Sequence, residues 1–384
     1  VLIGILYFLM ILVFSLMPAL KKEFVTRPLV SFFLLILKKY TYIFLSLLAV
    51  TLVSGCEPSN SEIIYSGSVM GTTYEVKIIS SKRIIPGMEK LIDTKLQSIN
   101  KIFTTYDKSS ELMILNESPI NVPQIVSSDM MNVLAIAQDV YIKTNGSFDP
   151  TVASLVNLWG FGPQLSAQKI PNDQQIASLL NLIGLNKLLI DKEKNLVTRL
   201  ADIKIDLSAI AKGYAVDYTA RLLDGYKIEN YLVEIGGELR MKGNNANGTN
   251  WIIAIEKPHF IQTGAQGVIQ ITDSGLATSW DYRNYFEKDG SRYSHMIDPR
   301  SGYPIKHNLV SATVIAKSAT EADAFSTAMM VLGPQQAIKV AKENNITVYL
   351  IIKNGENYDD IFSKEFNQYL TGEYFCLSNY LLSS

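Results

Sequence analysis

The sequence predicts an α+β fold, built largely from antiparallel sheets with interspersed helices. Strand-like alternation comes in runs separated by short turns, as in residues 231–235 and 238–242 on either side of Gly236-Gly237. Helix-like segments are scattered irregularly among these runs, and a regular strand–helix–strand alternation is missing. With 384 residues, 48% of them hydrophobic, the chain has ample material for a core.

The composition narrows the class of partner. Lysine plus arginine number 35 against 36 acidic residues, so no excess of positive charge indicates nucleic acid. The two cysteines, Cys56 and Cys376, lie far apart, which excludes a disulfide framework or a zinc knuckle. Walker, Rossmann, nucleophile-elbow and HExxH signatures are absent. We therefore expect a small molecule or a protein as the partner.

Hydrophobic segments cluster in the first 55 residues. Lys38-Lys39, an apolar stretch and then LVSGC at 52–56 have the charged, hydrophobic and small-residue regions of a secretory signal, and the last residues resemble a bacterial lipobox. Cys56 is then the lipidated residue, although a plain transmembrane anchor ending near Gly55 is an alternative. The expected organisation is a doubtful N-terminal extension or an extra hydrophobic segment at 1–36, a lipoprotein signal peptide at 37–55, the lipidated cysteine and a tether at 56–64, a folded domain at 65–370 and a tail at 371–384.

The first half of the domain mixes strands and helices. Residues 65–79 alternate as one strand, in which Gly71 indicates a bulge or a close backbone approach. Segments 88–103 and 128–143 have helical apolar spacing. Residues 146–163 are rich in aromatics and glycine without periodicity, so we expect a packed loop or, less often, a ligand wall.

Residues 203–223 predict a strand that runs directly into a helix. The alternation ends at Leu207, and Ser208 stands where an N-cap belongs. A strand that enters a helix across a short turn leaves backbone N–H groups pointing outward, which suits a phosphate. An ordinary capped helix is the alternative.

The second half contains the candidate chemistry. Ser318 and Glu321 form a capping-box pattern that opens a helix, and on it Asp323 and Thr327 are four residues apart and share a face. These oxygens could hold a hard cation such as Mg²⁺, or they could face solvent. His295 lies in a polar turn, where it is either a base or structural. Phosphate contacts, a cation and a base together fit phosphoryl transfer.

Several motifs follow one another in a fixed order along the chain. They are MGTTY at 70–74, TYD at 105–107, FDPTV at 148–152, NLWGFGP at 157–163, DLSAIAKGYAVD at 206–217, YLVEIGGE at 231–238, SHMIDPRSGYP at 294–304 and EADAFST at 321–327. Together they resemble the motifs of the ApbE family, the FAD:protein FMN transferases once described as thiamine biosynthesis lipoproteins. The resemblance covers about residues 62–370.

The resemblance implies an ApbE or T-fold-like architecture with the FAD site between two subdomains. It also implies an enzyme that cleaves FAD at its pyrophosphate with Mg²⁺, attaches FMN to a threonine hydroxyl of another protein and releases AMP. Family partners are membrane redox subunits such as those of the NADH:quinone reductase and the Rnf complex. A lipid-anchored enzyme on the periplasmic face of the bacterial inner membrane would meet them there.

Carried over by motif, the resemblance also implies roles for single residues. His295 would be the base and would lie at the FAD site, and Asp323 and Thr327 would bind the metal with the carbonyl group of Ala209. The remaining residues of the FAD site would be Met70, Tyr106, Phe148, Asp149, Asp206 and Lys212.

One position departs from the family pattern, and two other activities stay open. Trp280 follows Thr278-Ser279 where family members commonly have a small residue. The indole would narrow the flavin or acceptor pocket, or it would face outward harmlessly. The alternatives to transfer are hydrolysis of FAD to FMN and AMP, and a lipoprotein that binds FAD without reacting it.

Overall fold

The structure is a computed structural model that describes residues 39–41, 61–80, 85–162, 170–256, 265–280, 285–288 and 290–371. Within these ranges, no helix combines the length and the apolar character that a membrane crossing requires. The predictions for Cys56, for most of the signal peptide and for the tail after Thr371 fall outside the described residues. The first strand begins at Ser61, so regular structure starts before the boundary expected at residue 65.

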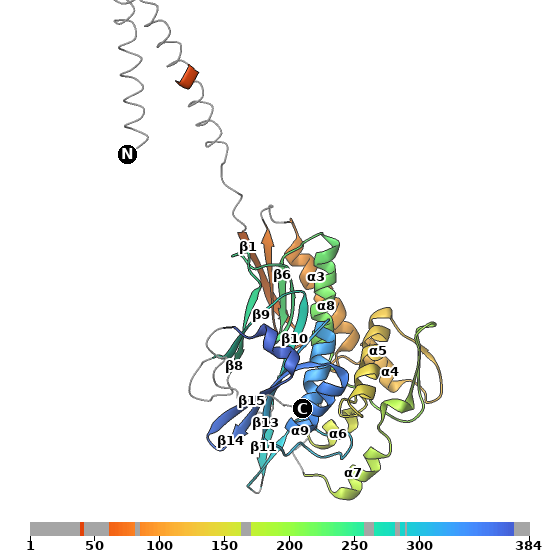
Figure 1. Cartoon of the computed structure of the whole chain (residues 1–384). Helices are drawn as coiled ribbons and strands as arrows, with labels where there is room; N and C mark the ends of the chain where they lie inside the picture. Colours follow the sequence, from red (N-terminus) through yellow and green to blue (C-terminus); the bar gives the residue numbers. More distant parts are fainter. Residues whose placement is uncertain are drawn as a thin grey trace, which may run out of the picture. The chain divides into compact units, whose positions relative to one another are not determined.

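An antiparallel sheet of eight strands forms the centre of the fold (Figure 1). It confirms the predicted α+β class with antiparallel strands. The strands lie in the order β1-β2-β6-β7-β10-β13-β14-β15. Their bounds are Ser61–Val69, Thr72–Ser80, Tyr231–Ile235, Glu238–Lys242, Ser274–Trp280, Leu309–Ala316, Thr347–Asn354 and Asn357–Phe362.

The two faces of this sheet bury different cores because successive side chains of a strand point to opposite faces. Val233 and Leu350 join the larger core, which also contains the helices. Their neighbours Leu232 and Ile351 join a second core on the other face. That face is covered by a hairpin of β8 and β9 and by the short helix η2. Their bounds are Trp251–Glu256, Ala265–Ile271 and Lys364–Tyr369.

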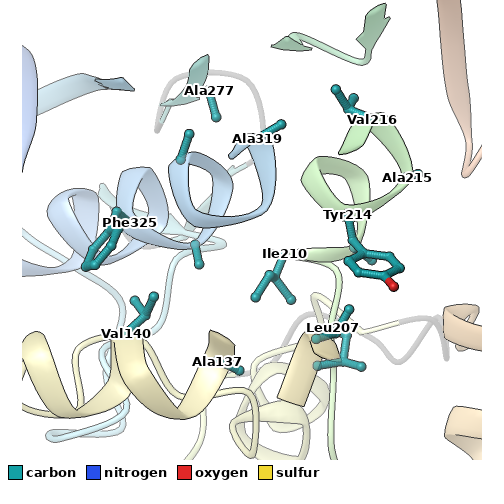
Figure 2. Packing of buried hydrophobic residues seen from close by; sticks show 14 of the residues in the cluster. Ala137, Val140, Leu207, Ile210, Tyr214, Ala215, Val216, Ala277, Ala319 and Phe325 are labelled. Atoms are coloured by element: carbon teal, nitrogen blue, oxygen red, sulfur yellow. The ribbon is translucent and has the colours of Figure 1, made fainter. Parts of the chain in front are cut away.

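Four long helices supply most of the larger core. In Figure 1, α8 and α9 lie beside the sheet and α5 lies beyond them, and α9 contacts β10, β13 and α5. Figure 2 shows Val140, Tyr214 and Phe325, one buried side chain from each of α5, α8 and α9. The bounds are α3 Met88–Phe103, α5 Ser128–Lys143, α8 Ala211–Gly225 and α9 Ala319–Asn344.

A smaller core is separate from the other two. Leu155, Trp159, Ile176, Phe286 and Ile297 pack together in it. It draws on α6, α7 and the hairpin β11–β12, whose bounds are Ala153–Leu158, Asp173–Leu180, Tyr285–Lys288 and Ser291–Ser294. The remaining elements are α4 Glu111–Glu117, β3 Gln124–Ile125, η1 Leu185–Lys187, β4 Leu188–Asp191 and β5 Leu196–Arg199.

Three local predictions need correction. Residues 65–79 are not one strand: Met70 and Gly71, with φ of 52° and 74°, form a two-residue turn between the paired strands β1 and β2. The stretch 146–163 is not only loop, because α6 lies inside it. Residues 203–207 form only an isolated bridge to Val152, and α8 begins at Ala211 with no side-chain cap.

Two glycines allow α9 to begin close to its neighbours. A Cβ atom on Gly213 of α8 would lie 2.3 Å from the carbonyl oxygen of Ala319, and one on Gly275 of β10 would lie 2.2 Å from the backbone nitrogen of Ala319. The side chain of Ser318 accepts a hydrogen bond from the backbone N–H of Glu321, as the capping pattern predicts. The first turn of α9 is therefore held between α8 and the sheet.

Candidate functional site

A cavity of about 510 Å³ lies where the large helical core meets the smaller core. Its size is in the range of small-molecule sites. The motifs that were far apart in sequence come together in its lining. The predicted residues that line it are Phe148, Asp149, Asp206, Ala209, Lys212, His295, Asp323 and Thr327.

Two predicted FAD contacts do not line this cavity. Met70 is in the β1–β2 turn and packs partly against the large core. Tyr106 follows α3 and is 84% exposed. Both residues stay predictions, with the structure placing them outside the cavity wall.

Asp323 is the buried acid at one side of the cavity. Its Oδ2 accepts a hydrogen bond of 2.9 Å from the backbone N–H of Gly213. Its Oδ1 accepts none from the described residues. Burial raises the pKa of the Asp323 carboxyl, against the lowering effect of the positive charge on Lys212. The close contact between α8 and α9 at Gly213 thus positions the Asp323 side chain and provides one of its hydrogen bonds.

Lys212 and Glu238 form an ion pair beside Asp323. Glu238 opens β7 after the Gly236-Gly237 turn and is 3% exposed, and burial raises the pKa of its carboxyl to about 8, helped by the charge of Asp323. Burial disfavours the ammonium of Lys212, but the carboxylates of Asp323 and Glu238 outweigh this and raise its pKa. We call Lys212, Glu238 and Asp323 the charged wall.

Hydroxyl and carbonyl oxygens lie near these charges. The Oγ1 atom of Thr327 is 3.3 Å from the Oγ atom of Ser279, which also bonds Ser326. Ala209 lines the same cavity just before α8. One carboxylate, one hydroxyl and a backbone carbonyl are a donor set that suits a hard cation, with water and substrate completing it. The described residues hold no cluster of three or more His, Cys, Asp or Glu side chains for a metal.

Asp149 and Asp206 use oxygens to hold the backbone. Oδ1 of Asp149 accepts hydrogen bonds from the N–H and hydroxyl of Thr151. Burial raises the pKa of Asp149, and these hydrogen bonds lower it in part. Oδ1 of Asp206 accepts from the N–H of Ser208 at 2.9 Å. Since Ser208 is held in this turn before Ile210, it does not cap α8, which explains the error in the predicted helix start.

Ring-bearing side chains also line the cavity. Phe148, Phe161, Trp280 and His295 line it, and we call these four residues the aromatic wall. The rings of Phe161 and His295 are 6.4 Å apart at 70°. Trp280 donates its indole N–H to the carbonyl of Thr278 at 2.6 Å. The structure therefore places Trp280 in the cavity lining, which favours the narrowing of the pocket over a harmless outward position.

Sequence reasoning missed Glu238 as a site residue, although a signal was present. Leu239 and Met241 of β7 face the second core. Alternation then puts Glu238 on the face that the helices cover, where an acidic residue is costly unless it is used.

Known proteins resemble the chain over most of its length. The ApbE family profile matches residues 70–350. FAD:protein FMN transferases of Vibrio cholerae and Escherichia coli are 40% and 41% identical, covering 85% and 81% of this chain and 98% and 90% of theirs. Among solved structures, the flavin transferase ApbE from Vibrio cholerae (38% identity) has a TM-score of 0.75 over 81% of this chain and 100% of its own. The apo flavinyl transferase ApbE of Pseudomonas stutzeri (34%) has 0.74 over 80% and 96%.

The fold and the cavity, with these relatives, define the class of the protein: it is a transferase enzyme. The chain belongs to the ApbE family.

Proposed function

We propose that the chain is a Mg²⁺-dependent FAD:protein FMN transferase that attaches FMN through a phosphoester bond to a threonine of a partner protein. The observation that carries this proposal is the single cavity that brings Lys212, His295, Asp323 and Thr327 together. The names of the relatives support the substrate. FAD would occupy the cavity between the two cores, as the two-subdomain prediction requires.

The transfer step exchanges one phosphorus–oxygen bond for another. The threonine oxygen attacks the phosphorus of the FMN half, and the bond from that phosphorus to the AMP oxygen breaks. His295 accepts the proton of the threonine hydroxyl, and AMP leaves with the electron pair of the broken bond. Lys212 binds phosphate oxygens and offsets their charge.

Asp323, Thr327 and the carbonyl of Ala209 would hold Mg²⁺ in this site. When bound, the ion neutralises charge on the phosphate oxygens under attack. Oδ1 of Asp323, which accepts no hydrogen bond from the described residues, would be available to the ion. Gly213 holds the other oxygen, so the carboxylate is already oriented.

The setting of the reaction is part of the same proposal. The lipobox that ends at Cys56 supports a lipid anchor on the periplasmic face of the bacterial inner membrane. Acceptors there would be redox subunits such as those of the NADH:quinone reductase or the Rnf complex.

One experiment separates transfer from its alternatives. The purified full chain is incubated with FAD, Mg²⁺ and an acceptor domain that carries a candidate threonine, beside the same domain with that threonine changed to valine. A fluorescent acceptor band with the added mass of FMN supports transfer. AMP and FMN without that band would mean hydrolysis, and unchanged FAD would mean binding only.

A further inference from the structure

Glu238 has one carboxylate oxygen that the fold leaves without a partner. The side chain is 3% exposed and lines the cavity. Oε1 pairs with Lys212, whereas Oε2 is buried and has no hydrogen-bond partner in the part of the chain that the structure describes. Buried carboxylate oxygens are costly when unpaired, so such an atom in a cavity wall needs an explanation.

Among the acids that line the cavity, Glu238 alone has a buried side-chain oxygen without a partner in the described part of the chain. Asp149 and Asp206 accept hydrogen bonds from neighbouring backbone N–H groups. Asp323 accepts one from Gly213 and is the proposed metal ligand. Oε2 of Glu238 is thus an acceptor that neither the fold nor the proposed chemistry uses.

The neighbour of Glu238 indicates what would bind there. Since Lys212 holds Oε1, the free oxygen lies next to the ammonium that would bind the pyrophosphate. Phosphate oxygens at neutral pH offer no hydrogen, and they repel the ionised form of Glu238, which is the form that pairs with Lys212. On both sides of the FAD pyrophosphate, however, the substrate has hydroxyl groups, on the ribityl chain and on the ribose.

We propose that Glu238 is a substrate-binding residue, whose Oε2 accepts a hydrogen bond from a sugar hydroxyl beside the FAD pyrophosphate while Oε1 positions Lys212. This inference rests on the proposed function. It states the chemical class of ligand that this part of the cavity selects, which is a hydroxylated chain next to a diphosphate. Glu238 is then retained for the substrate and contributes no stability to the free protein.

The test compares two ligands that differ in hydroxyl groups. Binding of FAD, followed by flavin fluorescence, and of inorganic pyrophosphate, followed by calorimetry, is measured with EDTA in the full chain and in Glu238→Gln. The variant keeps the size of the side chain and an oxygen for Lys212. We expect it to bind FAD about 10- to 100-fold more weakly, the usual loss for a hydrogen bond to a charged group. Pyrophosphate, which lacks hydroxyls, should bind at least as tightly as before.

Glu234→Gln is the matched control. Glu234 lies on the same hairpin, outside the cavity lining, and accepts a hydrogen bond from the N–H of Gly237 that glutamine can also accept. We expect unchanged affinity for both ligands. The Tm of Glu238→Gln should equal or exceed that of the parent, because a desolvated charge is removed.

Several results would overturn the inference. If Glu238→Gln binds FAD as tightly as the parent, the proposed hydrogen bond does not exist. If the variant loses the same affinity for FAD and for pyrophosphate, Glu238 acts only through Lys212. A lower Tm would make the carboxylate a structural element. In a separate Mn²⁺ titration without EDTA, loss of Mn²⁺ binding by Glu238→Gln with FAD binding retained would make Glu238 a metal ligand instead. A parent chain that binds no FAD at all would refute the proposed function rather than the role of Glu238.

Discussion

Two residues of the charged wall, Asp323 and Lys212, stand on long, tightly packed helices, whereas two of the aromatic wall, His295 and Phe161, follow short elements. Lys212 stands in the first turn of α8 and Asp323 at the start of the second turn of α9, and the two helices touch at Gly213. His295 follows the four-residue strand β12, and Phe161 follows the six-residue helix α6. The difference indicates a division of tasks, since groups that must resist repulsion between like charges need a rigid frame. Side chains that pack against a substrate ring or accept a proton do not face this repulsion, so they need a less rigid frame.

The most severe test of the charged wall is Asp323→Asn. The amide keeps the shape and an oxygen for the N–H of Gly213 but removes the charge that a cation needs. We expect Mg²⁺-dependent turnover to fall by about 1000-fold, the upper range for loss of one electrostatic contact in an active site. AMP release measures it, with Asp139→Asn on the exposed side of α5 as the control. Full activity in Asp323→Asn would refute the metal assignment.

His295→Ala tests the aromatic wall. If His295 takes the proton of the acceptor hydroxyl, FAD affinity should stay within a few-fold while transfer slows by roughly 100-fold or more. Flavin fluorescence gives the first quantity and labelling of the acceptor gives the second. Transfer at the parent rate would exclude His295 as the base, and equal losses of binding and rate would make it a binding residue.

Gly213→Ala tests the frame beneath the charged wall. The new methyl group would lie 2.3 Å from the carbonyl oxygen of Ala319 and 2.8 Å from the Cβ atom of Asp323, so α9 must move. We expect the free energy of unfolding to fall by about 1–3 kcal/mol, as for other overpacked sites. Urea unfolding measures it.

The same helix provides the control for this change. A Cβ atom on Gly225, at the other end of α8, would meet nothing within 4 Å. Gly225→Ala should therefore be neutral or stabilise by roughly 0.5–1 kcal/mol. Equal stability of the two variants would show that the contact at Gly213 does not hold α9 in place.

Much of the fold and part of the site could be predicted from the sequence. Periodicity located α3 and α5 because their apolar residues face one large core. It failed at 65–79, where alternation continues across the Met70-Gly71 turn and so conceals the hairpin. It failed again before α8, where the Asp206 side chain holds a turn that local pattern does not distinguish from a strand entering a helix.

The residues of the site likewise divide into those that local sequence patterns predict and those that depend on the tertiary fold. Asp323 and Thr327 were accessible because spacing on one helix places them on one face. The partnership of Lys212 with Glu238 was not, since it joins a helix to a strand through the register of the sheet. The sequence shows Trp280 as a departure from the family pattern. Its place in the cavity, however, depends on how β10 pairs with its neighbours.

The smallest expected effect concerns Glu238 and pH. Burial raises the pKa of its carboxyl to about 8, from 4.5 for the unperturbed group. Between these values the folded state binds more protons than the unfolded state, so this group lowers the free energy of unfolding as pH rises. Glu238→Gln lacks the group, and its stability relative to the parent should increase from pH 5 to pH 8, by about 1 kcal/mol or more. Urea unfolding of both proteins with EDTA and without FAD measures the difference. If the stability difference between the two proteins stays constant or shrinks as pH rises, Lys212 fully neutralises Glu238 in the free protein. The charged wall would then carry no unpaired charge before the substrate binds.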